Sequence, residues 1–281
     1  MRALIWCMDP VRIACVRYLN TIPLIAGLDR LEQAQLVMAA PAHIARLIEG
    51  GEADVGLVSV ADLARSEGGL TAVPAGMIGC DGPTFTVRLY SSVPFGSVRE
   101  IHVDEESHTS GVLCRLLLRE LHGVRVETVP FAAREHATDG EGDWPDTVLL
   151  IGDKVVTSTP PEGRYPHQMD LGDAWHGLTG LPFVYAVWAC RTEDAESQRV
   201  GTASAVLERQ RAHNQTRIDW VVTEHAASFG WPMDAARRYL GELLRYDFDA
   251  RAREGMTRFL SMASSGEPAL LPAWREVYAE V

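Results

Sequence analysis

The stretch Arg17-Tyr18-Leu19-Asn20-Thr21-Ile22-Pro23-Leu24 directly follows a short apolar run, residues 12–16, whose β-branched content predicts a buried strand. Pro23 has a fixed φ that suits the first turn of a helix, and Asn20 or Thr21 is available as the cap. A strand that leads straight into a helix N-terminus leaves backbone N–H groups facing outward, where they favour an anion. The stretch therefore predicts either a ligand-binding junction or a helix start that Asn20 and Thr21 only cap.

Composition and charge limit the class of protein. The 281 residues suffice for one large or two modest domains, and 47% hydrophobic with 23% charged residues is an ordinary globular balance. The net charge of −12, without a Lys/Arg-rich block, argues against a nucleic-acid partner but not against a small anionic ligand. No run approaches the ~18 apolar residues of a membrane span. Residues 3–8 are too short for a signal sequence, and we interpret them as a leader before the first strand.

The five cysteines are widely spread and form no Cys-x-x-Cys pair; they are Cys7, Cys15, Cys80, Cys114 and Cys190. Such a set is typical of reduced, mostly buried thiols, which favours a cytoplasmic protein. Their spacing indicates no metal site, and no cofactor is expected.

After the opening helix, strands and helices alternate at short intervals. The predicted elements are a strand at 35–38, a helix at 41–49, a strand at 54–58 and a helix at 60–65. This alternation predicts a mostly parallel sheet, and the ligands of such sheets bind outside the carboxyl ends of the strands. Asn20, Thr21 and Ser59 are all expected at that edge.

A strong turn signal, Asp81-Gly82-Pro83, precedes the predicted strand at 87–90. Gly82 lets the backbone approach a ligand closely, and Thr86 would present a hydroxyl at the start of the strand. On its own the tripeptide indicates only a turn, so a structural role and a ligand-binding role both stay open. Residues 92–97 are interpreted as a segment that crosses to a second part of the chain.

A second α/β unit follows, with a strand at 100–103 and a helix at 112–121. Between them, Ser107, Thr109 and Ser110 would add hydroxyls to the free N–H groups of the helix terminus. The pattern predicts either an anion cradle or a well-capped surface helix.

The apolar strand at 147–151 ends in Gly152-Asp153, which again lies on the ligand-facing edge. Asp153 could instead fix a neighbouring loop by accepting backbone N–H bonds. The polar residues 132–145, which precede this strand, are expected to form a loop.

The apolar run at 178–189 is expected to return the chain to the first lobe. Helical periodicity then continues in segments at 203–214, 217–228, 234–244, 249–264 and 272–281. This order predicts an α/β protein of two lobes, one formed by residues 1–93 with 187–281 and the other by residues 94–186. Two crossing strands, near residues 93 and 187, would join the lobes, with the ligand in the cleft between them.

The octet at residues 17–24 resembles the Ser-Tyr-Leu-Asn-Thr-x-Pro-Leu segment of the chorismate dehydratases of the futalosine menaquinone pathway. Residues 54–60 look like that family's Asp-Val-Ala-Leu-Val-Pro-Val. Further blocks similar to the family follow in the same order at 81–83, 107–110, 151–153 and 179–188. The likeness covers almost the whole chain, and the order and spacing of the blocks make it specific.

The resemblance implies a periplasmic-binding-protein-like type II fold used as a cytoplasmic enzyme. The implied enzyme is a carbon–oxygen lyase that converts chorismate to 3-(1-carboxyvinyloxy)benzoate and water. By position, the residues lining the family's cleft correspond to Asn20, Asp81, Gly82, Pro83, Ser107, Thr109, Ser110, Gly152 and Asp153. Thr86 stands where the family usually has a serine, and Arg17 replaces another serine.

We expect elimination of the ring hydroxyl with the adjacent ring proton, which makes the product aromatic. The matching blocks hold hydroxyls, amides and glycines but no obvious Glu or His base, so our hypothesis is that a carboxylate of the substrate takes the proton. Asn20 and Thr86 would position the ring and hydrogen-bond the departing oxygen, while the helix terminus at 107–110 would hold a carboxylate. His108 could act as a base, but under this hypothesis its removal leaves most of the turnover intact.

Three other functions stay open at this point. A non-catalytic binding or sensor protein of the same fold could use the same contacts on a small carboxylate. The sister enzyme of the pathway, 1,4-dihydroxy-6-naphthoate synthase, has the same fold but a different N-terminal motif. A nucleic-acid regulator with an effector domain is disfavoured, because no helix-turn-helix segment precedes the first strand.

Overall fold

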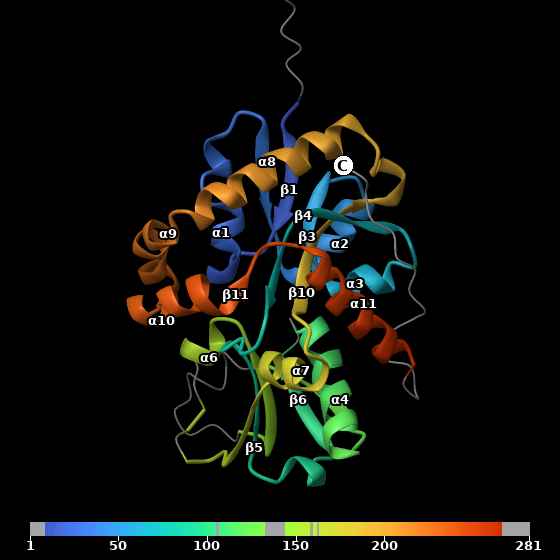
Figure 1. Ribbon diagram of the computed structural model, residues 1–281, viewed down its shortest axis with the longest axis vertical. Coiled ribbons are helices and arrows are strands. Elements are labelled where there is room, and N and C mark those ends of the chain that lie inside the picture. Colours follow the sequence, from blue (N-terminus) through green and yellow to red (C-terminus); the bar gives the residue numbers. More distant parts are fainter. Residues whose placement is uncertain (1–8, 105–106, 133–143, 158–159, 162, 266–281) are drawn as a thin grey trace, which may run out of the picture.

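Two lobes, each built on its own sheet, lie one above the other in the computed structural model (Figure 1). The structure describes residues 9–104, 107–132, 144–157, 160–161 and 163–265. The expected leader at 3–8, most of the expected loop at 132–145 and the expected helix at 272–281 fall outside the described residues.

Lobe 1 is organised around a six-stranded sheet with the order β11-β4-β10-β3-β1-β2. Its strands are β1 (Val11–Cys15), β2 (Ala34–Met38), β3 (Val55–Ser59), β4 (Leu70–Cys80), β10 (Phe183–Arg191) and β11 (Leu244–Arg245). Its helices are α1 (Ile22–Ile25), α2 (Pro41–Glu49), α3 (Val60–Arg65), α8 (Gln198–Gln215), α9 (Ile218–His225), α10 (Met233–Arg238) and α11 (Ala250–Ser264). β1 pairs in parallel with β2 and β3, whereas β10 runs antiparallel to β3 and β4.

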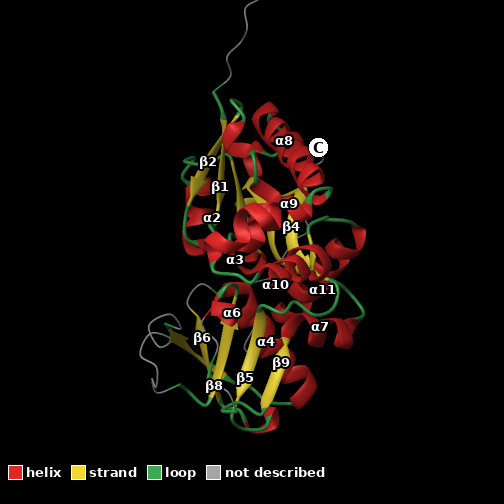
Figure 2. Cartoon of the chain, turned by 90° about the vertical axis from the view of Figure 1, so that its left-hand side faces the viewer, coloured by secondary structure: helices red, strands yellow, loops and turns green. Residues whose placement is uncertain are grey.

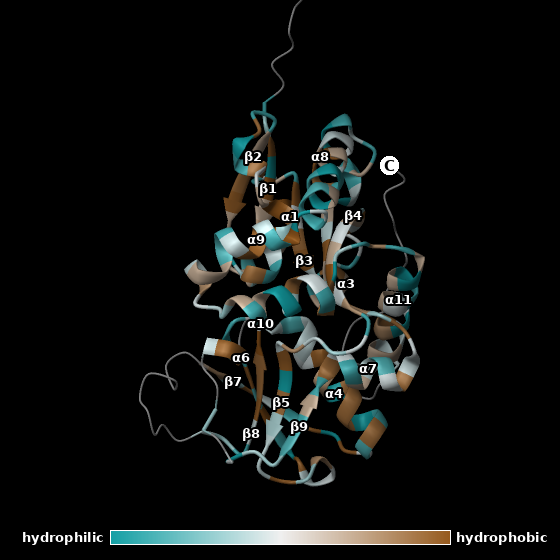
Figure 3. Ribbon diagram, turned by 60° about the vertical axis from the view of Figure 1, so that its left-hand side comes forward, coloured by the Kyte–Doolittle hydropathy of each residue, from teal (hydrophilic) through white to brown (hydrophobic). Residues whose placement is uncertain are grey.

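Both faces of the lobe 1 sheet are covered, which explains the nearly continuous apolar runs of its strands. Ile13 and Cys15 of β1 belong to the apolar cluster under α8, whereas Ala14 belongs to the cluster under α2. Gly56 of β3 lets α2 pack closely, since a Cβ there would lie 2.6 Å from Cγ2 of Ile44. In Figure 3 the strands carry apolar colours, while the visible face of α8 is largely hydrophilic.

Lobe 2 is organised around a five-stranded sheet with the order β7-β6-β8-β5-β9 (Figure 2). Its strands are β5 (Val87–Ser91), β6 (Glu100–Asp104), β7 (Glu127–Phe131), β8 (Thr147–Ile151) and β9 (His167–Asp170). Its helices are α4 (His108–His122), α6 (Lys154–Thr157) and α7 (Leu171–Thr179). β6 pairs in parallel with β7 and β8, and β5 runs antiparallel to β8 and β9.

The crossings between the lobes differ from the expected positions near residues 93 and 187. β4 ends at Cys80 in lobe 1 and β5 begins at Val87 in lobe 2, so the first crossing lies at 81–86. The second lies at 180–182, between α7 of lobe 2 and β10 of lobe 1. The apolar runs in the sequence predicted the strands β5 and β10. Only the pairing partners of each strand show to which sheet it belongs.

The predicted helices 41–49 and 60–65 coincide with α2 and α3, and the predicted strand 147–151 coincides with β8. Strand β4, Leu70–Cys80, was not predicted, because Pro74 and Gly76 interrupt the β pattern. Near the C-terminus, the predicted helix 234–244 divides into α10, one π-helical turn (Tyr239–Leu243) and β11. That single turn of π-helix places Tyr239 in the site described next.

Candidate functional site

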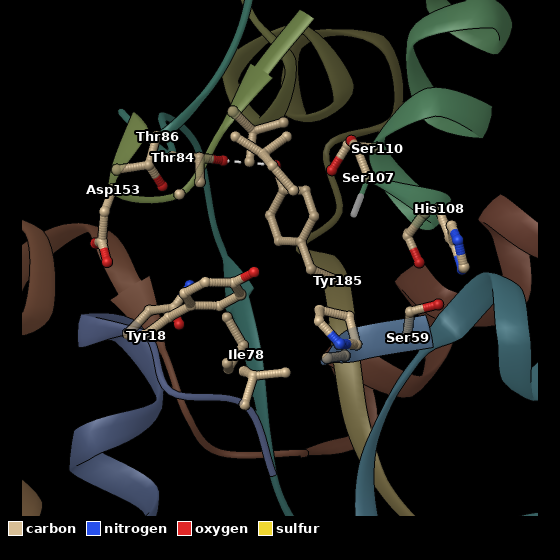
Figure 4. Close-up of a pocket in the computed structure, with 18 of the residues that line it drawn as sticks. Tyr18, Ser59, Ile78, Thr84, Thr86, Ser107, His108, Ser110, Asp153 and Tyr185 are labelled. Atoms are coloured by element: carbon tan, nitrogen blue, oxygen red, sulfur yellow. Dashed lines mark hydrogen bonds between the residues drawn. The ribbon is translucent and has the colours of Figure 1, made fainter. Parts of the chain in front are cut away.

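A cavity of about 120 Å³ lies between the two lobes and is lined from both of them. Lobe 1 contributes Asn20 from the turn before α1 and Ser59 from the end of β3, and lobe 2 contributes Thr86, Ser107 and Asp153. Figure 4 shows the hydroxyls and the carboxylate arranged around the ring of Tyr185. Ligand sites of two-lobed folds lie in such clefts.

Eight of the predicted site residues are brought together at this cavity. They are Asn20, Ser59, Thr86, Ser107, Thr109, Ser110, Gly152 and Asp153. They come from five separate elements or junctions, so the expected gathering at the carboxyl ends of strands holds for β3, β6 and β8.

Four predicted site residues do not line the cavity: Thr21, Asp81, Gly82 and Pro83. Thr21 is fully buried, and its hydroxyl donates to Oδ1 of Asn20 at 3.3 Å. It therefore helps to orient the Asn20 amide without reaching the cavity itself. The carboxylate of Asp81 lies 3.0 Å from Nδ1 of His176, on the outer side of the crossing. Within the crossing it is Thr84 and Thr86, just beyond the turn, that reach the cavity.

The N-terminus of α4 presents a concentration of donors. Ser107 caps the helix by position, but its buried Oγ has no hydrogen-bond partner among the described residues. Ser110 lies one turn further on and points toward the cavity (Figure 4). Because the first N–H groups of a helix have no intrahelical acceptors, this end can hold an anion.

Thr109 and His108 link this helix terminus to lobe 1. The hydroxyl of Thr109 accepts a hydrogen bond from the backbone N–H of Ala61 at 3.1 Å. Nδ1 of His108 lies 2.8 Å from both carboxylate oxygens of Asp62, to which Ser59 also donates at 2.8 Å. Burial acts to raise the pKa of Asp62, but the hydrogen bond and charge of His108 outweigh it, and the pKa is lowered. Since Nδ1 faces Asp62, only Nε2 of His108 is left for a ligand.

Two tyrosines that sequence reasoning missed complete the wall of the cavity. Tyr185 of β10 shares a hydrogen bond of 2.7 Å with Thr84, and burial raises its pKa well above the ordinary value. The hydroxyl oxygen of Tyr239 accepts hydrogen bonds from Thr86 at 2.7 Å and from Nδ2 of Asn20 at 3.3 Å. No local signal marks Tyr239, which is 219 positions from Asn20 in the chain.

The first crossing is held in place by a carboxylate. Asp170 accepts hydrogen bonds from the backbone N–H groups of Thr84 at 2.9 Å and Phe85 at 2.6 Å, and it also caps α7. Phe85 has a φ of 73°, a left-handed conformation that a residue with a side chain adopts only when its surroundings impose it. Asp170 thus fixes the backbone from which Thr84 and Thr86 project.

Asp153 and Lys154 carry the charges at the end of β8. Asp153 accepts a hydrogen bond from the indole Nε1 of Trp231 at 2.7 Å, so it contacts lobe 1 in addition to lining the cavity. Lys154 is buried and forms an ion pair with Asp104. Backbone N–H groups were the expected donors to Asp153, whereas the donor from lobe 1 is the side-chain indole of Trp231.

Within the part of the chain that the structure describes, no group of three or more His, Cys, Asp or Glu side chains could hold a metal ion. No helix among the same residues is long and apolar enough to cross a membrane. The described cysteines, Cys15, Cys80, Cys114 and Cys190, are buried free thiols.

Two α/β lobes with a cavity between them define the class of periplasmic-binding-protein-like α/β proteins, and the predicted type II fold is confirmed. A protein from Archaeoglobus fulgidus of known structure shares this fold at a TM-score of 0.73 and 16% identity, covering 92% of this chain and 97% of its own. The aliphatic sulphonate binding protein SsuA of Escherichia coli shares it at a TM-score of 0.66 and 13% identity, covering 98% and 94%. At these identities the likeness concerns the fold alone.

Residues 11–265 match the model of a family described as menaquinone biosynthesis, and the chain belongs to that family. A curated relative, the chorismate dehydratase of Thermus thermophilus, is 29% identical in an alignment 267 residues long that covers 90% of this chain and 94% of the relative. The resemblance found in the sequence blocks is thus confirmed at the level of the family.

Proposed function

We propose that the chain is a chorismate dehydratase, a carbon–oxygen lyase that converts chorismate to 3-(1-carboxyvinyloxy)benzoate and water in menaquinone biosynthesis. Family membership and the similarity to the Thermus thermophilus enzyme support the proposal. The observation that carries it is the set of amide and hydroxyl groups gathered from two lobes around one cavity, beside a helix terminus suited to a carboxylate. No cofactor or metal takes part in the proposed reaction.

The N-terminus of α4 is the proposed carboxylate site. Chorismate carries two carboxylates, and one of them would accept hydrogen bonds from the first N–H groups of α4 and from the hydroxyls of Ser107 and Ser110. Ser107 is suited to this role because its buried Oγ lacks a partner among the described residues. A bound carboxylate oxygen would provide one.

Asn20 and Thr86 are the proposed catalytic residues. In the reaction one ring C–H bond and the adjacent C–O bond break, the hydroxyl leaves as water with that proton, and the ring becomes aromatic. Asn20 and Thr86 would hydrogen-bond the departing oxygen and hold the ring in place. The proton acceptor would be a carboxylate of the substrate. His108, the only imidazole lining the described cavity, binds Asp62 through Nδ1, and its Nε2 is the alternative acceptor that a substitution tests.

Gly152 and Asp153, Thr109 and Ser59 are the remaining proposed substrate-binding residues, since all four line the cavity. Thr21, Asp81, Gly82 and Pro83 would act on the substrate only indirectly, through Asn20 and the crossing. We place the enzyme in the cytoplasm, where the buried free thiols of the described chain stay reduced.

Incubation of the purified protein with chorismate tests the function. We expect an aromatic product that has lost one water from the substrate, detected by absorbance and by mass after chromatography. Reactions without protein measure the spontaneous decay of chorismate, and reactions with the Asn20→Ala variant show whether turnover depends on the cavity. Tight binding without any product would identify a binding protein of the same fold, and neither binding nor product would reject chorismate as the ligand.

A further inference from the structure

Tyr239 occupies the point where the two proposed catalytic residues meet. Its side chain is 1% exposed, and its hydroxyl oxygen lies 2.7 Å from Oγ1 of Thr86 and 3.3 Å from Nδ2 of Asn20, both of which donate to it. Asn20 belongs to lobe 1, whereas Thr86 ends the crossing into lobe 2. One buried hydroxyl therefore spans the junction of the lobes at the cavity wall.

The ring of Tyr239 is held by two aromatic neighbours, Trp231 and Phe85. It stacks on Trp231 with the centroids 4.9 Å apart and the planes 7° from parallel. The ring of Phe85 packs edge-on against both, at 6.1 Å from Trp231 and 6.4 Å from Tyr239. Trp231 in turn donates its indole N–H to Asp153 at 2.7 Å. Rotation of the tyrosine ring would disturb contacts to both lobes.

The backbone at Tyr239 departs from ordinary helix geometry. Residues 239–243 form one π-helical turn after α10, and Gly241 lies within it. An inserted π-turn changes the direction in which side chains leave a helix and is often found at functional sites. Here it brings the Tyr239 hydroxyl to the cavity while its ring stays buried.

We infer that Tyr239 is a positioning residue, whose hydroxyl holds the amide of Asn20 and the hydroxyl of Thr86 in the arrangement that elimination requires. The inference rests on the proposed function and deepens it. Tyr239 itself carries no step of the reaction, because its effect is exerted through the two groups that it binds.

The hydrogen bonds around Tyr239 also assign different roles to Asn20 and Thr86. The Asn20 amide is oriented from both ends, since Oδ1 accepts from Thr21 at 3.3 Å and one Nδ2–H donates to Tyr239. Its second N–H is left for the departing oxygen. Thr86 uses its O–H to donate a hydrogen bond to Tyr239, so its oxygen faces the cavity as an acceptor and orients the substrate hydroxyl. Burial raises the pKa of Tyr239, which keeps the phenol neutral and this arrangement unchanged over the working pH range.

The Tyr239→Phe variant removes the hydroxyl and keeps the ring stacked on Trp231. We expect kcat to fall about 10- to 100-fold with KM changed less than about threefold, because misplacement by roughly 1 Å costs about 100-fold in rate while substrate contacts remain. Tyr246→Phe is the matched control. Tyr246 is equally buried, at 2% exposed, but its hydroxyl has no partner among the described residues and does not line the cavity. Its removal should leave kcat unchanged.

Variants of Thr86 test the same hydrogen bond by changing its donor instead of its acceptor. Thr86→Val removes the donor at nearly constant shape, and Thr86→Ser keeps it and should retain kcat within about threefold. In the double variant Thr86→Val with Tyr239→Phe, we expect kcat no more than about threefold below that of the lower single variant, because both changes break one interaction. The comparison of the single and double variants still tests the positioning role if Tyr239→Phe alone proves less stable to heat.

The outcomes separate this inference from the proposed function. Wild-type protein that dehydrates chorismate while Tyr239→Phe matches it in kcat, or losses that multiply in the double variant, would overturn the positioning role and leave the function intact. Wild-type protein without turnover would instead overturn the proposed function. A loss in Tyr239→Phe that appears only as a higher KM would also contradict the inference, since it would mark a binding contact.

Discussion

The two sides of the cavity are built in different ways. On one side, the N-terminus of α4 supplies Ser107 and Ser110 from a single helical turn that includes the intervening backbone N–H groups. On the other side, Asn20, Thr86 and Tyr239 converge from three distant segments. The first side needs only a local sequence pattern and suits anion binding. The second side, called the converging side below, depends on the packing of the two lobes and suits the orientation of the reacting groups. Substitutions on the α4 side should therefore change mainly KM, and substitutions on the converging side should change mainly kcat.

The largest effect is expected from Asn20→Ala on the converging side. Loss of the amide removes the donor proposed for the departing oxygen and one partner of Tyr239. By analogy with the removal of one oxyanion-hole donor, kcat should fall about 100- to 1,000-fold with little change in KM. Steady-state kinetics with chorismate measure both constants. A variant that keeps wild-type kcat would show that the converging side is not the reacting side.

On the α4 side, the double variant Ser107→Ala with Ser110→Ala should weaken binding. Hydrogen bonds to a charged group stabilise by roughly 1.5–3 kcal/mol each, so we expect the loss of two of them to raise KM about 100-fold, while the backbone N–H groups still hold the carboxylate. The value of kcat should stay within about threefold, because these hydroxyls contact the carboxylate equally before and during the reaction. A loss confined to kcat would contradict the division of labour between the sides.

The same division explains what the sequence could reveal. The α4 terminus was predictable because Ser107, Thr109 and Ser110 fall within four consecutive residues at the point where a strand leads into a helix. Ser59 and Gly152-Asp153 were predictable for a similar reason, since each follows an apolar strand whose carboxyl end faces the cleft. The two-lobed α/β architecture also followed from the order of strands and helices, whereas the type II fold was implied by the resemblance to the family.

Tertiary packing decided the rest. Tyr239 belongs to a segment predicted as continuous helix, and nothing in residues 234–244 indicates a π-helical turn. The resemblance to the family placed Asp81 in the cleft, yet the crossing bends so that Thr84 and Thr86 line the cavity instead. The lobe boundaries were displaced for the same reason, because pairing of β5 with β8 and β9 involves partners far along the chain.

A smaller effect is expected for His108→Gln, which lies where the two sides meet. If the substrate carboxylate takes the proton, turnover should stay within about tenfold of wild type, whereas loss of a general base costs about 100- to 10,000-fold. The pair with Asp62 makes Nε2 the ring nitrogen to be tested. A fall beyond about 1,000-fold, accompanied by loss of the acidic limb of the pH–rate profile, would make His108 the base.

The smallest kinetic effect is expected from Asp54→Asn. This substitution should lower the stability of the protein without changing either side of the cavity. Asp54 binds Arg12 and Arg199, each at 2.8 Å, in the lobe 1 sheet and does not line the cavity. Burial acts to raise its pKa, but the hydrogen bonds from both arginines outweigh it and lower the pKa to about 2. With kcat and KM unchanged, the variant should lose about 2 kcal/mol of unfolding free energy at neutral pH.

The pH dependence of this loss follows from the lowered pKa. A carboxylate whose pKa is depressed in the folded state contributes its stability above its unfolded pKa, and the contribution disappears as pH falls through the folded value. The difference in stability between wild type and Asp54→Asn should therefore be constant near neutrality, shrink from about pH 4 and vanish near pH 2. Urea unfolding over this range measures it. If the variant instead lowered kcat at neutral pH, a loss of stability in lobe 1 alone would suffice to disturb the converging side, and the kinetic test with Asn20 would lose its meaning.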